Sequence, residues 1–184
     1  MSKQRVLVPI ADGSEDIESA TIIDVLRRAE LEVTVASVMP EGRLEITAAR
    51  GIRMVADAHI EQCQGQTFDL IALPGGAKGA ENLRDSELLI EMLREQRDSG
   101  RWFAAICASP AVVFASHGLE QGFATTGHPN FTEQLSDHRN QRVVVDRNCI
   151  TSQGPGTALE FSLQLVESLL GREARDRVAA PMVL

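Results

Sequence analysis

The chain has 184 residues, of which 43% are hydrophobic and 24% are charged, which are ordinary values for a globular domain with its own core. Its formal net charge of -8 argues against nucleic acids and anionic membranes as partners, because both attract basic surfaces. A small molecule or another protein is therefore the expected partner.

The N-terminal segment and the cysteines predict a cytoplasmic protein. The first apolar run, Val6 to Ile10, is too short for a signal peptide or a membrane span. Three cysteines, which is an odd number, do not form a disulfide framework. Each cysteine is therefore expected to be a free thiol in a reducing compartment.

Short apolar segments alternate with longer amphipathic segments along the chain. The pattern predicts strands at 5–10, 32–38, 68–73, 102–106, 142–145 and 149–151, with two strand-like pieces between 44 and 60 around Arg50 and Gly51. It predicts helices from the cap residue Ser14 to about Ala29, then at 86–96, 108–115, from 156 onward and at 173–178. We expect a single domain, 1–184, of the α/β class, with a mostly parallel sheet and helices on both faces.

One strand, 68–73, ends in the unusual sequence Pro74-Gly75-Gly76. In open α/β sheets, ligands bind beyond the carboxyl ends of the strands. Two adjacent glycines permit close backbone approach, so that consecutive amides can point at an anion. The alternative is that both are ordinary turn glycines.

Cys107 lies between the predicted strand 102–106 and a helix opened by Ala108-Ser109-Pro110. At such a junction the positive end of the helix dipole lowers the pKa of a thiol, and the tight turn has the geometry of a nucleophile elbow. A small buried core thiol is the alternative. Cys63 and Cys149 precede no helix, and we expect both to be buried structural thiols.

His128 and Glu18 are the candidates for acid–base chemistry. His128 follows a short strand in a loop, and the pKa of histidine lies near neutrality. Glu18 falls near the apolar edge of the first helix, where burial would raise the pKa of its carboxyl and let it donate a hydrogen bond. The alternative for each is a solvated side chain. The histidine spacing fits no metal site, and no nucleotide-binding motif is complete, so neither a metal nor an organic cofactor is expected.

Taken together and in this order, these motifs resemble the ThiJ/PfpI superfamily, and within it the branch of the parkinsonism-associated deglycase and the bacterial YajL proteins. The matching segments extend along the whole chain and are 13–18, 24–29, Leu73-Pro74-Gly75-Gly76, Ile106-Cys107-Ala108-Ser109-Pro110, His128-Pro129 and 151–157. The resemblance implies a flavodoxin-like three-layer sandwich that forms homodimers.

The resemblance also implies a role for each matching residue. Cys107 would be the reactive nucleophile, and Glu18 would be a buried, protonated acid that hydrogen-bonds the sulfur. His128 would be the nearby histidine. The remaining positions would bind substrate or stabilise an oxyanion or sulfinate, and they are the amides of Gly75, Gly76 and Ala108 and the side chain of Arg50, an arginine at the dimer-facing part of the site.

Two functions follow from one activated thiol. The first is a cofactor-independent glyoxalase or deglycase that acts on methylglyoxal, glyoxal or their early adducts on proteins and nucleotides, and so protects against carbonyl and oxidative stress. The alternative is a redox-sensing stress chaperone whose cysteine is oxidised to the sulfinate, without substantial turnover. A cysteine peptidase is disfavoured, because Ala108 stands where the protease-like branch has a histidine directly after the cysteine.

Overall fold

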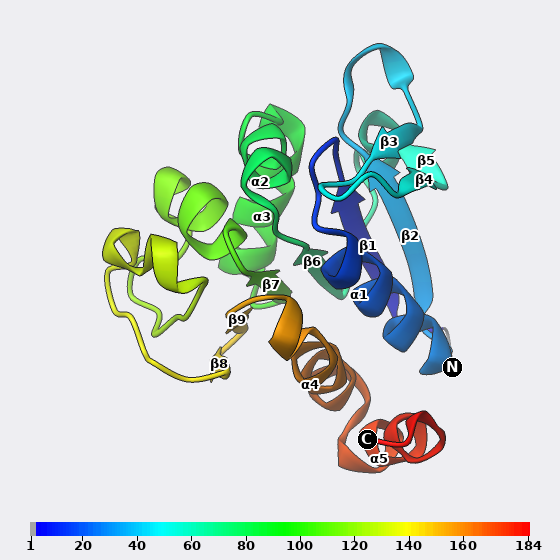
Figure 1. The fold of residues 1–184 in the computed structure, drawn as a ribbon, viewed down its shortest axis with the longest axis vertical. Coiled ribbons are helices and arrows are strands. Elements are labelled where there is room, and N and C mark those ends of the chain that lie inside the picture. Colours follow the sequence, from blue (N-terminus) through cyan, green and yellow to red (C-terminus); the bar gives the residue numbers. More distant parts are fainter. Residues whose placement is uncertain (1–2) are drawn as a thin grey trace.

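Residues 3–184 are described by the structure, a computed structural model built around a seven-stranded sheet (Figure 1). The strand order is β5-β2-β1-β6-β7-β9-β8, and only β8, at one edge, runs antiparallel to its neighbour. The strands are β1 (Arg5–Ile10), β2 (Glu32–Ser37), β5 (Ala58–His59), β6 (Leu70–Leu73), β7 (Trp102–Ile106), β8 (Val143–Asp146) and β9 (Cys149–Ser152). A separate antiparallel hairpin is formed by β3 (Glu45–Thr47) and β4 (Arg53–Val55).

Five α-helices connect and cover the strands. They are α1 (Asp16–Arg28), α2 (Ala77–Arg84), α3 (Glu87–Ser99), α4 (Ala158–Leu170) and α5 (Arg172–Ala179). Shorter helical turns lie at Pro40–Gly42, Ile60–Cys63, Pro110–Phe114, Ala115–His117, Pro129–Gln134, Pro155–Thr157 and Ala180–Met182.

The strand order places the helices in two layers. The chain crosses from β1 through α1 to β2 in one direction, and from β6 through α2 and α3 to β7 in the other. Because such crossovers are right-handed, α1 lies on one face of the sheet and α2 and α3 lie on the other. Helix α4 packs against α1 and α5. The expected flavodoxin-like sandwich is therefore confirmed. The connections that follow the neighbouring strands β1 and β6 lead in opposite directions along the sheet, so the loops at the carboxyl ends of these two strands diverge.

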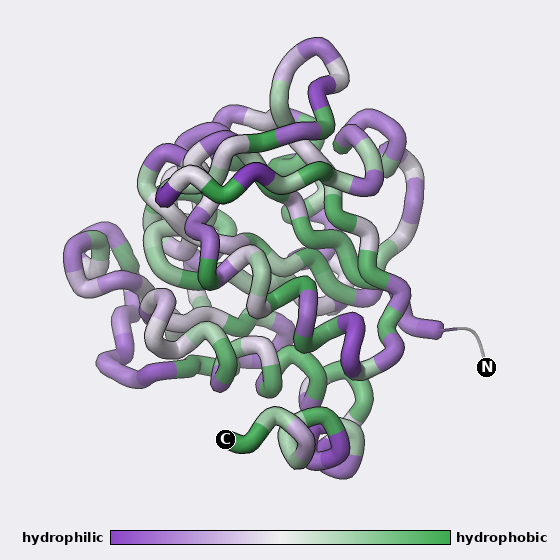
Figure 2. Tube along the Cα trace, turned by 45° about the vertical axis from the view of Figure 1, so that its right-hand side comes forward, coloured by the Kyte–Doolittle hydropathy of each residue, from purple (hydrophilic) through white to green (hydrophobic). Residues whose placement is uncertain are grey.

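The three central strands read as nearly continuous apolar runs because both of their faces are covered. In β1 the side chains of Val6, Leu7, Val8 and Ile10 are fully buried, and every residue of β6 is buried. Figure 2 shows the hydrophobic tube segments gathered in these strands and the hydrophilic ones in the outer loops. This rigid centre fixes the positions of the strand ends that carry the site.

The start of the first helix corrects the prediction that Ser14 is its cap. The cap is Glu15, whose carboxylate accepts a hydrogen bond from the N–H of Glu18 at 2.8 Å. The hydroxyl of Ser14 instead accepts from the N–H of Ala11 at 3.0 Å. The side chain of Ser14 is therefore used within its own turn, and the helix begins at Asp16.

Two other predicted helical regions differ from the structure. Helix α2 was not expected, because it follows the glycine pair directly and contains Gly79, a poor helix former. A side chain at Gly79 would collide with the backbone of Ser14, so glycine is required for α2 to pack against the turn after β1. The run after Cys107 is not one regular α-helix but a π-helical turn, Pro110–Phe114, followed by a 3-10 turn, Ala115–His117.

Candidate active site

Cys107 lies on a sharp turn directly after β7. Its φ angle is +66°, a left-handed conformation that is costly for residues other than glycine. Both backbone groups are held, since its N–H donates to the carbonyl of Ser152 at 3.0 Å and its carbonyl accepts from the N–H of His128 at 2.8 Å. The side chain is 8% exposed. The turn has the elbow geometry expected from the sequence, with the thiol at the carboxyl end of the sheet.

Glu18 brings a carboxyl group to the same place from helix α1. It is fully buried, and its Oε2 accepts a hydrogen bond from the N–H of Gly75 at 2.7 Å. Its Oε1 has no hydrogen-bond partner among the described residues. Burial raises the pKa of Glu18 to about 7, against the opposing effect of the Gly75 N–H. The carboxyl can therefore carry or release a proton near neutral pH, and it is not the solvated side chain of the alternative interpretation.

The pKa of the Cys107 thiol is raised, whereas the sequence predicts that it is lowered. Burial raises its pKa to about 12, and the negative charge of Glu18 acts in the same direction, while the N–H groups of Gly76 and Ala108 lower it. The expected lowering fails because the sulfur is buried beside a carboxyl group and because only short, irregular helical turns follow it. A proton on Glu18 removes the repulsion, so the ionisation of one group is coupled to that of the other.

The glycine pair after β6 is packed tightly against both of these side chains. An added Cβ at Gly75 would lie 2.5 Å from the Cβ of Cys107 and 2.7 Å from Oε2 of Glu18. Gly76 has a φ of +86° and precedes α2. The N–H of Gly75 is already used by Glu18, which corrects the expectation that it joins an anion pocket. The amides directed at the sulfur are those of Gly76 and Ala108.

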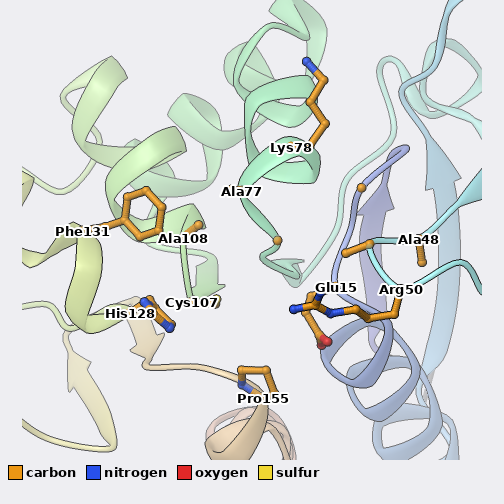
Figure 3. Close-up of a pocket in the computed structure, with 13 residues that line it drawn as sticks. Glu15, Ala48, Arg50, Ala77, Lys78, Cys107, Ala108, His128, Phe131 and Pro155 are labelled. Atoms are coloured by element: carbon orange, nitrogen blue, oxygen red, sulfur yellow. The ribbon is translucent and has the colours of Figure 1, made fainter.

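A cavity of about 500 Å³ opens in front of Cys107 (Figure 3). Five of the seven predicted site residues line it, namely Arg50, Gly76, Cys107, Ala108 and His128. The other two, Glu18 and Gly75, are not among the lining residues. Sequence reasoning missed the other lining residues, which are Gly13, Glu15, Ala48, Ala49, Ala77, Lys78, Phe131 and Pro155. Glu15 and Lys78 lie a few residues after the ends of β1 and β6, and this position in the sequence could have indicated that they line the site.

His128 forms one side of this cavity. Its Nδ1 accepts a hydrogen bond from the N–H of Asn130 at 3.2 Å, and its ring lies edge-on to Phe131 with 6.1 Å between the ring centroids. Because Nδ1 is an acceptor, the neutral ring carries its proton on Nε2. Figure 3 shows the ring beside Cys107. The position allows proton exchange with a molecule in the cavity.

Arg50 forms the opposite side, at the turn between β3 and β4. Its backbone N–H donates to the buried carboxylate of Asp16 at 2.7 Å, and the N–H of Ile52 donates to the same carboxylate at 3.2 Å. Figure 3 shows the side chain of Arg50 extended toward the cavity near Glu15. Asp16 therefore fixes the turn that presents Arg50.

The remaining cysteines lie outside the cavity and are buried, as expected for structural thiols. Both are 1% exposed, and burial raises the pKa of the Cys63 and Cys149 thiols. Within residues 3–184, no cluster of histidine, cysteine and acidic side chains is arranged to hold a metal ion. In the same part of the chain no helix is long and apolar enough to cross a membrane.

Comparison with known proteins places the chain in a defined group. Residues 4–168 match the model of the DJ-1/PfpI family. The chain is 48% identical over 171 residues to "Protein DJ-1 homolog B" of Arabidopsis thaliana, covering 92% of this chain but only 39% of that protein. It is 36% identical to "Glutathione-independent glyoxalase DJR-1.2" of Caenorhabditis elegans, covering 97% of this chain and 95% of that protein. The structure entitled "Toxoplasma gondii DJ-1, oxidized" is 43% identical, with a TM-score of 0.95 and 98% of each chain covered.

Proposed function

This chain belongs to the DJ-1/PfpI family, and we propose that it is a cysteine-dependent enzyme that acts on small α-oxoaldehydes, or on their early adducts with proteins and nucleotides, without a cofactor. The single observation that carries the proposal is the pairing of the Cys107 thiol with the buried Glu18 carboxyl at the base of an open cavity. The glyoxalase name of a relative that matches this chain over nearly its full length supports it.

The first step is addition of the Cys107 sulfur to the aldehyde carbon. Glu18, which titrates at about 7, takes the thiol proton as the carbon–sulfur bond forms. The aldehyde oxygen becomes an oxyanion and receives hydrogen bonds from the N–H groups of Gly76 and Ala108. The product of this step is the hemithioacetal oxyanion, with the thiol proton held on Glu18.

The second step moves a hydrogen between the two carbonyl carbons. His128 removes the proton from the carbon bound to sulfur, and Glu18 protonates the neighbouring ketone oxygen, which gives an enediolate. Return of the proton from His128 to the second carbon leaves a thioester on Cys107. Water then hydrolyses this thioester to the hydroxy acid and regenerates the thiol. Methylglyoxal and one water thus give lactate, with no external oxidant or reductant.

A direct test is incubation of the protein with methylglyoxal in the absence of glutathione. The proposal predicts that lactate accumulates and that acid quenching during turnover leaves the mass of one methylglyoxal on the peptide containing Cys107. Lactate formation without any adduct on that peptide would contradict the covalent route. Absence of lactate would contradict the enzyme itself.

A redox-sensing chaperone is the second candidate, because Cys107 lines the cavity and peroxide can therefore reach its thiol. Peroxide would oxidise the Cys107 sulfur first to a sulfenic acid and then, with a second peroxide, to a sulfinic acid, with water as the other product. The amides of Gly76 and Ala108 and a protonated Glu18 would stabilise the sulfinate by hydrogen bonds. The similar structure from Toxoplasma gondii is named as an oxidized DJ-1, and this name supports the second candidate.

We also propose that the chain forms a homodimer. Ile17 on α1 and Ile52 after the Arg50 turn are more than half exposed, although both are large and apolar. Light scattering should give twice the mass of the chain, and Ile17→Glu should shift the population to the monomer. A monomer in the unaltered protein at micromolar concentration would contradict this proposal.

A further inference from the structure

Ser109 follows Cys107 closely on the elbow, and its hydroxyl is not used where its position would suggest. It is the cap residue of the helical turn Pro110–Phe114, and serine is a preferred cap because its side chain can accept a backbone N–H of the first turn. Within residues 3–184 its side chain makes no such cap hydrogen bond. The hydroxyl, which is fully buried, instead donates to the carbonyl of Pro74 at 2.6 Å. Ser109 therefore joins the elbow that carries Cys107 to the end of β6.

The carbonyl of Pro74 and the N–H of Gly75 belong to one peptide group. This peptide is trans, so the two groups point in opposite directions. The N–H donates to Oε2 of Glu18 at 2.7 Å, and all of these residues are buried. Hydrogen bonds therefore run from the Ser109 hydroxyl through this peptide group to the Glu18 carboxyl.

A hydrogen bond to the oxygen of a peptide group makes the N–H of that group a stronger donor. Such cooperative strengthening amounts to about 10–30% per bond. A stronger N–H stabilises the ionised carboxyl, so the Ser109 hydroxyl adds to the effect by which the Gly75 N–H lowers the pKa of Glu18 against burial. The ionisable groups that also act on this carboxyl are Glu15, at the cap of α1, and Cys107.

The same peptide group also fixes the distance between the two reactive side chains. Gly75 packs so closely that an added Cβ would lie 2.5 Å from the Cβ of Cys107. A tilt of the peptide would therefore move the N–H away from Glu18 or change the packing beside Cys107. The hydroxyl of Ser109 opposes such a tilt, because it holds the carbonyl end of the peptide.

We propose that Ser109 is a positioning residue for Glu18, and that its hydroxyl orients and polarises the Pro74–Gly75 peptide group whose N–H binds the carboxyl. Ser109 is not among the residues that line the cavity, so it acts on a reaction there only through Glu18 and Cys107. Its effect on turnover rests on the proposed function, whereas its effect on Glu18 does not.

The test follows the ionisation of Glu18 in the folded protein by NMR, with isotope-labelled glutamate carboxyl groups and the Glu18 signal assigned by its absence from Glu18→Gln. We expect Ser109→Ala to raise the titration midpoint by about half a pH unit. Ser162→Ala is the matched control, because Ser162 is also fully buried and its hydroxyl donates to the carbonyl of Ala158 at 2.7 Å, within α4. An unmoved midpoint in Ser109→Ala, or an equal rise in Ser162→Ala, would overturn the inference.

Turnover then separates this inference from the proposed function. Because Glu18 must be ionised to take the thiol proton, the rise of kcat/KM for methylglyoxal with pH should move to higher pH in Ser109→Ala, by the same amount as the titration. A shifted titration with no lactate from the unaltered protein would keep the role of Ser109 and overturn the enzyme. Lactate formation with an unmoved titration and an unmoved pH dependence in Ser109→Ala would keep the enzyme and overturn the inference.

Discussion

Gly75 is in such close contact with Cys107 that a Cβ atom on Gly75 would lie 2.5 Å from the Cβ of the cysteine. The same atom would lie 2.7 Å from Oε2 of Glu18, which accepts the Gly75 N–H. One glycine therefore packs against the two groups that the proposed chemistry requires. Its lack of a side chain is a steric requirement, since its φ angle is not positive.

Gly75→Ala should destabilise the protein and disable the site. The added methyl group must displace Cys107, Glu18 or the backbone of β7, and overpacking of this kind costs about 1–3 kcal/mol. Gly156→Ala is the matched control, because a Cβ there meets no atom within 4 Å. Urea unfolding should show a lower midpoint for the first variant only. Equal midpoints for both variants would contradict the packing described.

The pH dependence of stability should carry the signature of Glu18. Its pKa is 4.5 when unfolded and about 7 when folded, so the folded state binds more protons between these values. The free energy of unfolding must then fall as pH rises from about 4.5 to above 7, by about 3 kcal/mol for this group. Urea unfolding at pH 5 and pH 8 should show that Glu18→Gln lacks this loss. Parallel behaviour of the two proteins would contradict the raised pKa.

Glu18→Gln should also separate catalysis from simple thiol reactivity. Glutamine preserves the acceptor for the Gly75 N–H but cannot exchange a proton, so kcat for methylglyoxal should fall about 10²–10⁴-fold. Alkylation of Cys107 by iodoacetamide should continue, because the sulfur and its access remain. If turnover survives in this variant, Glu18 is not the proton carrier. If alkylation also stops, its role is structural.

Oxidation should be selective for one of the three cysteines. Cys107 is 8% exposed and adjoins the cavity, whereas Cys63 and Cys149 are each 1% exposed and belong to the core. Limited peroxide followed by peptide mass spectrometry should find sulfinate on Cys107 before either of the others. Oxidation of Cys63 with Cys107 unmodified would remove the basis of the sensor candidate.

The sequence was sufficient to predict the sheet and the centre of the site, because these depend on local patterns. Buried parallel strands appear as apolar runs, and Cys107 was identified from its place between a predicted strand and a predicted helix. The occupation of the Gly75 N–H by Glu18 could not be predicted, since it depends on a contact between residues far apart in the chain. The helix cap is local, but Ser14 and Glu15 are both able to accept a hydrogen bond there, and the pattern does not show which of them does so. The pKa of Cys107 was predicted in the wrong direction, because the sequence predicts a regular helix after the cysteine, whereas the structure has only short helical turns there and buries the thiol.

Lactate formation from methylglyoxal by a Cys107→Ser variant tests the central claim most directly. Cys63→Ser and Cys149→Ser serve as controls, since both replace buried thiols outside the cavity. The account predicts that lactate formation is lost in Cys107→Ser and retained in any control variant that folds. Undiminished lactate formation by Cys107→Ser would contradict the assignment of Cys107 as the nucleophile.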